Sequence, residues 1–310
     1  MSNRFSELSN RIKGRVITDA PMSQYTTYRI GGPADCLAKP EDIEDIGELL
    51  AFGREQHIPV TIIGNGSNLL VSDLGIEGLV IRIGSNMSTH RIEDDVLYAG
   101  TGCILSDVAR ETARLGYRGL QWAAGIPASL GGATYMNAGA FGHNFYENLR
   151  QVIAVDREGS QIILSQEELA AGYRNTLLME KGYIAAEVAV NLQKDDAAKL
   201  TAEAEEIMAT RRHNQPLNYP SCGSVFKNPE GSHAGYLVEK TGLRGLRVGN
   251  VQVSEKHGNF IVNLGGGTAK EVQELLKTVA RRVEEEQGYI LEPEVRMIGR
   301  EEEGFVCPNC

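Results

Sequence analysis

The sequence has little of several features that mark particular classes of protein. It has no basic tract, only 6% aromatic residues and a net charge of −10, so we do not expect a nucleic-acid-binding surface. It has no apolar run of about eighteen residues, which a membrane-spanning helix needs. Its first ten residues lack the apolar core of a signal peptide. We therefore expect a cytoplasmic protein with no membrane or nucleic-acid partner.

Cysteine is also scarce, with five residues scattered along the chain. An odd, scattered set is typical of a reduced compartment and not of a disulfide framework. Cys307 and Cys310 form a terminal C-x-x-C pair, which supplies only two of the four ligands of a structural zinc site. The six His show no ligand spacing, so no metal site is expected. Because the pair follows a charged segment, we expect residues 301–310 to form a flexible tail.

Two common nucleotide-binding motifs are missing. No G-x-x-x-x-G-K-[ST] P-loop occurs. The loop at residues 64–68, G-N-G-S-N, follows a predicted strand over residues 58–63, but Leu69 stands where the dinucleotide motif needs its last Gly. A Rossmann site is therefore disfavoured. A loop of small and amide residues after a strand can still bind a pyrophosphate through its backbone N–H groups.

A longer run of small residues occupies positions 125–142, G-I-P-A-S-L-G-G-A-T-Y-M-N-A-G-A-F-G. Nine of these eighteen residues are Gly or Ala, and none is charged. Such a backbone allows another group to approach closely. We expect residues 129–132 to begin a short helix whose N–H groups suit a phosphate. The alternative is a tightly packed structural turn.

The apolar periodicity predicts a mixed fold. Helical spacing appears over residues 41–57, 105–115, 195–212 and 268–287. Residues 1–25 are polar and predict a short helix with a loop, whereas residues 289–298 predict a final strand. Strands and helices follow one another without a regular β-α-β order, which favours the α+β fold class.

Several segments, in this order, resemble the UDP-N-acetylenolpyruvoylglucosamine reductase (MurB) family. They are T-I-I-G-N-G-S-N at 61–68, A-G-I-P-A-S-L-G-G-A at 124–133, N-A-G-A at 137–140, Y-R at 173–174, P-S-C-G-S-V-F-K-N-P at 220–229 and L-E-P-E-V-R at 291–296. The resemblance implies a two-subdomain FAD-binding fold of the vanillyl-alcohol-oxidase type and a C-terminal α+β substrate-binding domain. The expected domains are residues 1–84 and 85–210 for FAD, 211–300 for substrate, and the tail.

The resemblance assigns non-covalent FAD binding to the two glycine-rich segments. The residues concerned are Ile63, Gly64, Asn65, Gly66, Ser67, Asn68, Gly125, Ile126, Pro127, Ala128, Ser129, Gly131, Gly132, Ala138 and Gly139. It assigns substrate binding to Tyr173, Lys227 and Asn228.

The resemblance also assigns three catalytic roles. Arg174 would act on the reacting enolpyruvyl group, Ser224 would donate a proton, and Glu294 would be the carboxylate beside the serine. From residue types alone, a surface arginine and a serine in a surface turn are alternatives. Glu294 alternates with two other charged residues, which normally indicates a solvent-exposed strand face.

The reaction implied by the resemblance uses NADPH and FAD to reduce UDP-N-acetylglucosamine enolpyruvate, a UDP-sugar, to UDP-N-acetylmuramate for peptidoglycan synthesis. No obligatory protein partner is expected. One alternative is an alcohol oxidase on the same scaffold, which often binds FAD covalently through His, yet neither glycine-rich segment contains a His. The other is a non-enzymatic sugar-nucleotide sensor, although the predicted catalytic Ser, Arg and Glu are all present.

Overall fold

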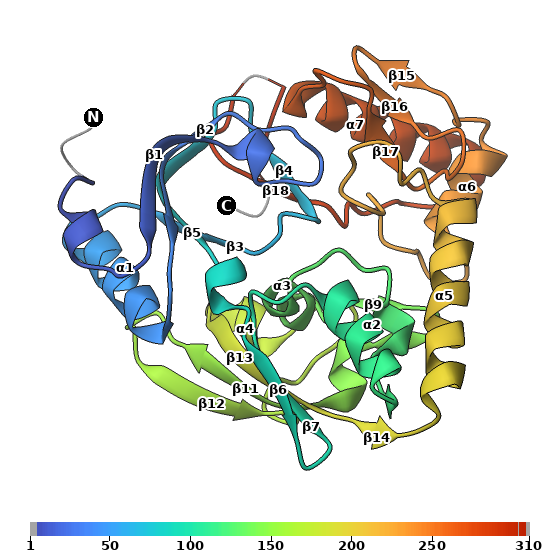
Figure 1. Cartoon of the computed structure of the whole chain (residues 1–310). Coiled ribbons are helices and arrows are strands. Elements are labelled where there is room, and N and C mark those ends of the chain that lie inside the picture. The colour runs from blue at the N-terminus through green and yellow to red at the C-terminus, as the bar shows by residue number, and fades with distance from the viewer. Residues whose placement is uncertain (1–4, 303, 308–310) are drawn as a thin grey trace. The chain divides into compact units, whose positions relative to one another are not determined.

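The computed structural model describes residues 5–302 and 304–307, in which helices and strands are mixed along the chain (Figure 1). The α-helices are α1 (Ile43–Glu55), α2 (Leu105–Arg114), α3 (Leu130–Tyr135), α4 (Leu177–Lys181), α5 (Ala197–Asn214), α6 (Ala234–Lys240) and α7 (Ala269–Gln287). The short 3-10 helices are η1 (Leu8–Asn10), η2 (Met22–Gln24), η3 (Ser85–Met87), η4 (Gln121–Ala123) and η5 (Phe145–Asn148). No helix in these two ranges is long and apolar enough to cross a membrane.

The strands alternate irregularly with the helices, as expected for an α+β fold. They are β1 (Arg15–Pro21), β2 (Pro33–Lys39), β3 (Val60–Ile63), β4 (Leu69–Val71), β5 (Ile76–Arg82), β6 (His90–Glu93), β7 (Val96–Gly100), β8 (Tyr117–Arg118), β9 (Gly139–Ala140), β10 (His143–Asn144), β11 (Leu149–Val155), β12 (Gln161–Ser165), β13 (Ile184–Asn191), β14 (Gln193–Lys194), β15 (Arg247–Val248), β16 (Val251–Val253), β17 (Ile261–Asn263) and β18 (Arg296–Ile298).

The chain divides into two compact units, and each is discontinuous in sequence. The first unit contains residues 1–18, 36–65 and 78–210, and the second contains residues 19–35, 66–77 and 211–310. The division expected from the sequence, at residues 84, 210 and 300, stays a prediction. Residues 19–35 and 66–77 precede the first of those boundaries but belong to the second unit.

Helix α1 shows how the local sequence determines one element of the first unit. The Asp42 side chain accepts a hydrogen bond from the backbone N–H of Asp45, and this bond begins the helix. Ile46, Leu49 and Phe52 then recur on one face and are completely buried. They pack in one hydrophobic cluster with residues of a four-stranded sheet whose order is β1-β2-β5-β3. Strands β3 and β5 of this sheet run parallel.

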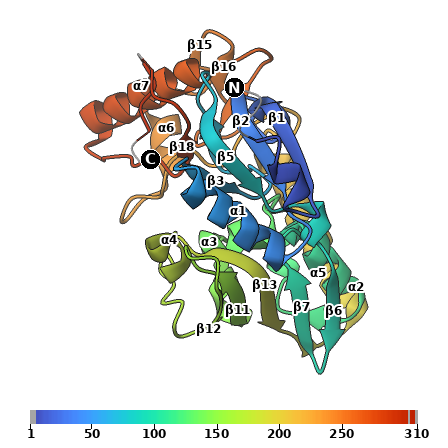
Figure 2. The same cartoon turned by 90° about the vertical axis from the view of Figure 1, so that its left-hand side faces the viewer.

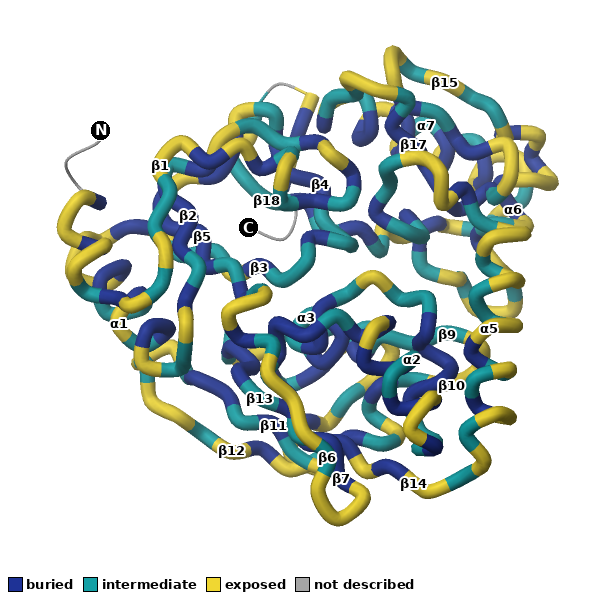
Figure 3. Tube along the Cα trace, viewed as in Figure 1, coloured by how far each residue is buried: buried dark blue, intermediate teal, exposed yellow. Residues whose placement is uncertain are grey.

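The first unit also contains a five-stranded antiparallel sheet of order β12-β11-β13-β7-β6. Strands β12, β11 and β13 lie side by side (Figure 2), and β13 is buried along most of its length. Helix α3 packs against β13, so the glycine-rich run lies on the central strand of this sheet. The long helix α5 is mostly exposed (Figure 3).

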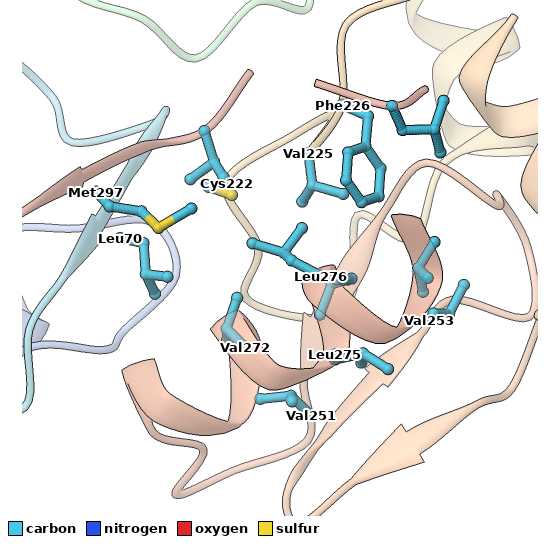
Figure 4. Packing of buried hydrophobic residues seen from close by; sticks show 14 of the residues in the cluster. Leu70, Cys222, Val225, Phe226, Val251, Val253, Val272, Leu275, Leu276 and Met297 are labelled. Carbon is cyan, nitrogen blue, oxygen red and sulfur yellow. The ribbon is translucent and has the colours of Figure 1, made fainter. Parts of the chain in front are cut away.

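The second unit is built around α7, which packs against the three-stranded sheet β15-β16-β17. Thr268 and Glu271 form a capping box that begins α7. The apolar residues that recur along one face of α7 are all buried: Val272, Leu275, Leu276, Val279 and Val283. Figure 4 shows several of them packed together with residues of distant segments. One such segment is β4, which pairs in parallel with β18.

Three expectations differ from the structure. Residues 1–25 contain a three-residue 3-10 helix, Leu8–Asn10, and then strand β1 where a loop was expected. The final strand is limited to β18. Among the residues before it, Pro293 makes only an isolated bridge, with Phe226. Phe305 and Cys307 of the expected flexible tail are buried in the core around α7. Cys310 lies outside the described residues.

Candidate active site

The first glycine-rich loop and the glycine-rich run lie next to each other in the first unit. The Asn65 side chain donates a hydrogen bond to the carbonyl oxygen of Pro127 at 2.7 Å. At Gly64, a Cβ atom would lie only 2.1 Å from the Ser129 hydroxyl, so no larger residue fits there without a shift. The sequence predicted both segments, and the structure places residues 64–65 beside residues 127–129. Residues 66–68 belong to the second unit.

Helix α3 begins where the sequence predicted, with Ser129 as its N-cap. The first backbone N–H groups of the helix already have acceptors, however. Leu130 donates to Cys103, Gly131 donates to Thr101, and Gly132 donates to the Ser129 hydroxyl at 3.2 Å. These three N–H groups are therefore not available for a phosphate, contrary to the expectation for residues 129–132.

Other backbone donors at the same junction are available. Within residues 5–302 and 304–307, the N–H groups of Gly64, Asn65, Ala128 and Ser129 have no acceptor. Backbone donors in a folded protein are normally paired, so such a group of donors is suited to water or to an anionic ligand. These residues fit the diphosphate of a dinucleotide cofactor.

Arg174 is held against the end of the glycine-rich run. Its guanidinium donates hydrogen bonds to the carbonyl oxygens of Asn137 at 3.2 Å and Gly139 at 3.5 Å, and its Cζ lies 4.9 Å from the centre of the Tyr173 ring. The residue has φ +57°, in the left-handed region that non-glycine residues rarely adopt. Residues 172–175 form a turn closed by an isolated bridge between Gly172 and Asn175. The two hydrogen bonds and the contact with the Tyr173 ring hold this guanidinium in place.

Ser224 and Glu294 occupy neighbouring segments of the second unit. The backbone N–H of Glu294 donates to the carbonyl oxygen of Val225 at 2.8 Å, and Phe226 forms an isolated bridge with Pro293. Gly223, before the serine, has φ +80°, which glycine adopts without strain. Ser224 and Glu294 are each half-buried, whereas Val225 and Phe226 are buried in the core (Figure 4).

Asn68, which the sequence assigned to the cofactor, binds the segment that carries Glu294. Its side-chain amide donates to the carbonyl oxygen of Glu294 at 3.0 Å, and its own carbonyl oxygen accepts from the N–H of Arg296 at 2.9 Å. The end of the first glycine-rich loop is thus attached to the backbone of the segment that carries the predicted catalytic carboxylate, within one unit.

Lys227 and Asn228 have protein partners of their own. The Lys227 ammonium lies 3.1 Å from a carboxylate oxygen of Glu292, in an exposed ion pair that contributes about 0–1 kcal/mol. The Asn228 side chain accepts a hydrogen bond from the N–H of Ala234 at the start of α6. Substrate binding by these two residues stays a prediction.

Sequence reasoning missed three buried residues near Ser224. Burial raises the pKa of Cys222 to about 12, and the charge of Glu294 contributes to this rise. The Tyr28 hydroxyl is completely buried without a hydrogen-bond partner in the described structure. The side chain of Asn259 hydrogen-bonds the backbone of Phe226. Only the position of Cys222 inside the P-S-C-G-S motif was a usable signal.

No group of three or more His, Cys, Asp or Glu side chains in the described part of the chain could hold a metal ion.

Comparison with known proteins relates both parts of the chain to one enzyme family. A model described as the C-terminal domain of UDP-N-acetylenolpyruvoylglucosamine reductase matches residues 215–298, and an FAD binding domain model matches residues 34–165. The reductase of Heliobacterium modesticaldum is 45% identical over 295 residues, which is 95% of this chain and 94% of that protein. The reductase of Desulforamulus reducens is 41% identical over 95% of this chain and 97% of its own length.

A solved structure agrees with these relatives. The crystal structure of UDP-N-acetylenolpyruvylglucosamine reductase from Thermus caldophilus matches with a TM-score of 0.79 and 36% identity, over 92% of this chain and 99% of that one. The expectation of an α+β FAD-binding domain followed by a distinct C-terminal domain is confirmed.

Proposed function

Because the chain belongs to the UDP-N-acetylenolpyruvoylglucosamine reductase family, we propose that it is the enzyme that reduces UDP-N-acetylglucosamine enolpyruvate to UDP-N-acetylmuramate, with NADPH as hydride donor. The observation that carries the proposal is the 45% identity over 95% of the chain. The product is a precursor of peptidoglycan. The cytoplasmic location remains part of the proposal.

FAD is the cofactor of this reaction, and when bound it supplies the hydride that NADPH provides. The backbone donors of Gly64, Asn65, Ala128 and Ser129 would bind its diphosphate. The remaining residues predicted from the resemblance, in the loop at 63–68 and the run at 125–139, stay part of this proposal.

In the second unit, Ser224 would donate a proton to carbon. Hydride addition to the enolpyruvyl double bond leaves negative charge beside the substrate carboxylate, and a proton must then reach that carbon. A half-buried hydroxyl on a segment bonded to core residues keeps a defined position, which general-acid catalysis requires. Glu294, on the adjoining segment, would stabilise or relay this proton.

Arg174, in the first unit, would bind the carboxylate of the enolpyruvyl group. A guanidinium can donate two parallel hydrogen bonds to a carboxylate. Tyr173 would contact the substrate beside it, and Lys227 would bind a phosphate or carboxylate of the sugar nucleotide.

The test separates the two halves of the reaction by stopped-flow absorbance of the flavin. Ser224→Ala should leave reduction by NADPH nearly unchanged and slow reoxidation by the enolpyruvyl substrate by about a hundredfold to ten-thousandfold. Ser224→Cys should recover part of the loss. Ser221→Ala, in the same loop, is the matched control and should leave both rates unchanged.

Two results would contradict the proposal. Purified protein that contains no FAD and cannot be reconstituted with it would exclude a flavoenzyme. If Ser224→Ala slowed both half-reactions equally, the serine would be structural, and unchanged rates in both halves would mean that the proton comes from another group.

A further inference from the structure

The side chain of Asn259 binds the backbone next to Ser224 through two hydrogen bonds. Its Oδ1 accepts from the N–H of Phe226 at 2.9 Å, and its Nδ2 donates to the carbonyl oxygen of Phe226 at 2.8 Å. The residue is only 4% exposed, so water does not compete with these bonds. By binding both the N–H and the carbonyl oxygen of Phe226, the carboxamide makes the two hydrogen bonds that a neighbouring strand would make in a sheet.

The main chain of the same region adds further contacts to the serine segment. The N–H of Val225 donates to the carbonyl oxygen of Asn259 at 3.0 Å, and Ser224 forms an isolated antiparallel bridge with Phe260. On the other side, the carbonyl oxygen of Val225 accepts from Glu294. The segment that carries Ser224 makes only isolated bridges, so these individual bonds determine its position.

His257 orients Asn259 in turn. Its Nδ1 accepts a hydrogen bond from the backbone N–H of Asn259 at 3.1 Å. Its ring lies 4.8 Å from that of Phe260, edge to face at 65°. Burial and the charge of Arg244 lower the pKa of His257, against an opposing effect of Glu239, and this favours the neutral ring, whose Nδ1 has the lone pair that this bond needs.

We propose that Asn259 is a positioning residue for the proton transfer, because its carboxamide fixes the segment that carries Ser224. The inference rests on the proposed function, in which Ser224 is the proton donor. Displacement of a reacting group by about 1 Å can cost about a hundredfold in rate. Removing the carboxamide should therefore slow the step that uses Ser224 and leave other steps unchanged.

The experiment compares Asn259→Ala with the native enzyme in both half-reactions. Reoxidation of the flavin by the enolpyruvyl substrate should slow by about tenfold to a hundredfold, and reduction by NADPH should stay within about twofold. Hydrogen exchange of the cofactor-free protein gives a second readout, because the Phe226 amide should exchange faster without its acceptor. If Asn259→Ala does not fold, Asn259→Asp keeps the size of the side chain, loses the donor to Phe226 and should slow the same half-reaction.

Asn263→Ala is the matched control. Asn263 is also 4% exposed and lies in the same unit, but its side chain binds the backbone of Tyr28, Gly265 and Gly267. Its loss removes a similar number of buried hydrogen bonds without touching residues 224–226. This variant should be destabilised and yet keep a reoxidation rate within about threefold of the native rate.

The double variant with Asn259→Ala and Ser224→Ala tests whether Asn259 affects the rate through Ser224. Once the serine hydroxyl is gone, loss of Asn259 should change reoxidation by less than about threefold. Multiplicative effects, or equal slowing by Asn259→Ala and Asn263→Ala, would overturn the inference. A slow Ser224→Ala with a normal Asn259→Ala would refute the positioning role alone, whereas a normal Ser224→Ala would refute the proposed function and this inference with it.

Discussion

Replacing Gly64 with alanine tests the contact that joins the two glycine-rich segments. The new Cβ would lie 2.1 Å from the Ser129 hydroxyl, about 1.3 Å closer than an ordinary contact of about 3.4 Å. Overpacking of this kind costs about 1–3 kcal/mol. Displacing the hydroxyl also removes the N-cap bond to Gly132, which contributes about 1 kcal/mol. We expect Gly64→Ala to lower the free energy of unfolding by about 2–4 kcal/mol.

The assay is urea unfolding of the cofactor-free protein, followed by the fluorescence of Trp122. This is the single Trp of the chain, and it is buried in the same unit. Gly47→Ala in the middle of α1 is the control, because its Cβ would meet nothing closer than 3.4 Å. The control should raise stability by up to about 1 kcal/mol, since alanine favours a helix more than glycine does.

A second substitution should relieve the clash. Ser129→Gly removes the hydroxyl, and glycine at an N-cap costs only a few tenths of a kcal/mol. The double variant with Gly64→Ala should therefore recover all but about 1 kcal/mol of the native stability. The reasoning is refuted if Gly64→Ala is as stable as the native protein, or if Ser129→Gly fails to restore it.

Two further predictions concern the second unit. Tyr28→Phe removes a buried hydroxyl that has no partner in the described structure, so stability should rise by about 1 kcal/mol and Tm by about 2 °C; a lower Tm in thermal unfolding would contradict this. Lys227→Ala breaks only an exposed ion pair and should change stability by less than about 1 kcal/mol. Lys227→Ala should nevertheless weaken the binding of the sugar nucleotide, measured by calorimetry, while its FAD content stays normal. Glu292→Ala is the control and should not weaken this binding. If Lys227→Ala and the native protein bound the sugar nucleotide with equal affinity, Lys227 would lie outside the binding site.

The sequence predicted the helices and strands that are marked by a pattern only a few residues long. Helix α7 has a capping box and an apolar residue on nearly every turn, so both its start and its buried face could be predicted. Strand β1 has no such signal, because the apolar residues of its sequence, R-V-I-T-D-A-P, do not alternate with polar ones. Its pairing within the first sheet, and not its composition, makes it a strand.

The residues of the candidate site likewise differ in whether the sequence could identify them. Ser224 and Glu294 could be named because each lies in a contiguous motif that resembles a family. Asn259 lies in no recognisable motif, and its role depends on hydrogen bonds to a residue 33 positions earlier in the chain. The N–H groups at the start of α3 were wrongly expected to be available, since their acceptors at residues 101 and 103 become neighbours only on folding.

The parallel pairing of β4 with β18 has a consequence for synthesis on the ribosome. Leu70 pairs with Met297, so β4 must wait for a segment that is made 227 residues later (297 − 70). At about 5–20 residues per second, the interval is roughly 10–50 s. Leu70 is completely buried in the finished protein, in a cluster that includes Met297 and residues of α7, so its final packing is absent throughout that time. The second unit can therefore complete its folding only after β18 has been synthesised, and a nascent chain that stops before β18 would leave β4 without this partner.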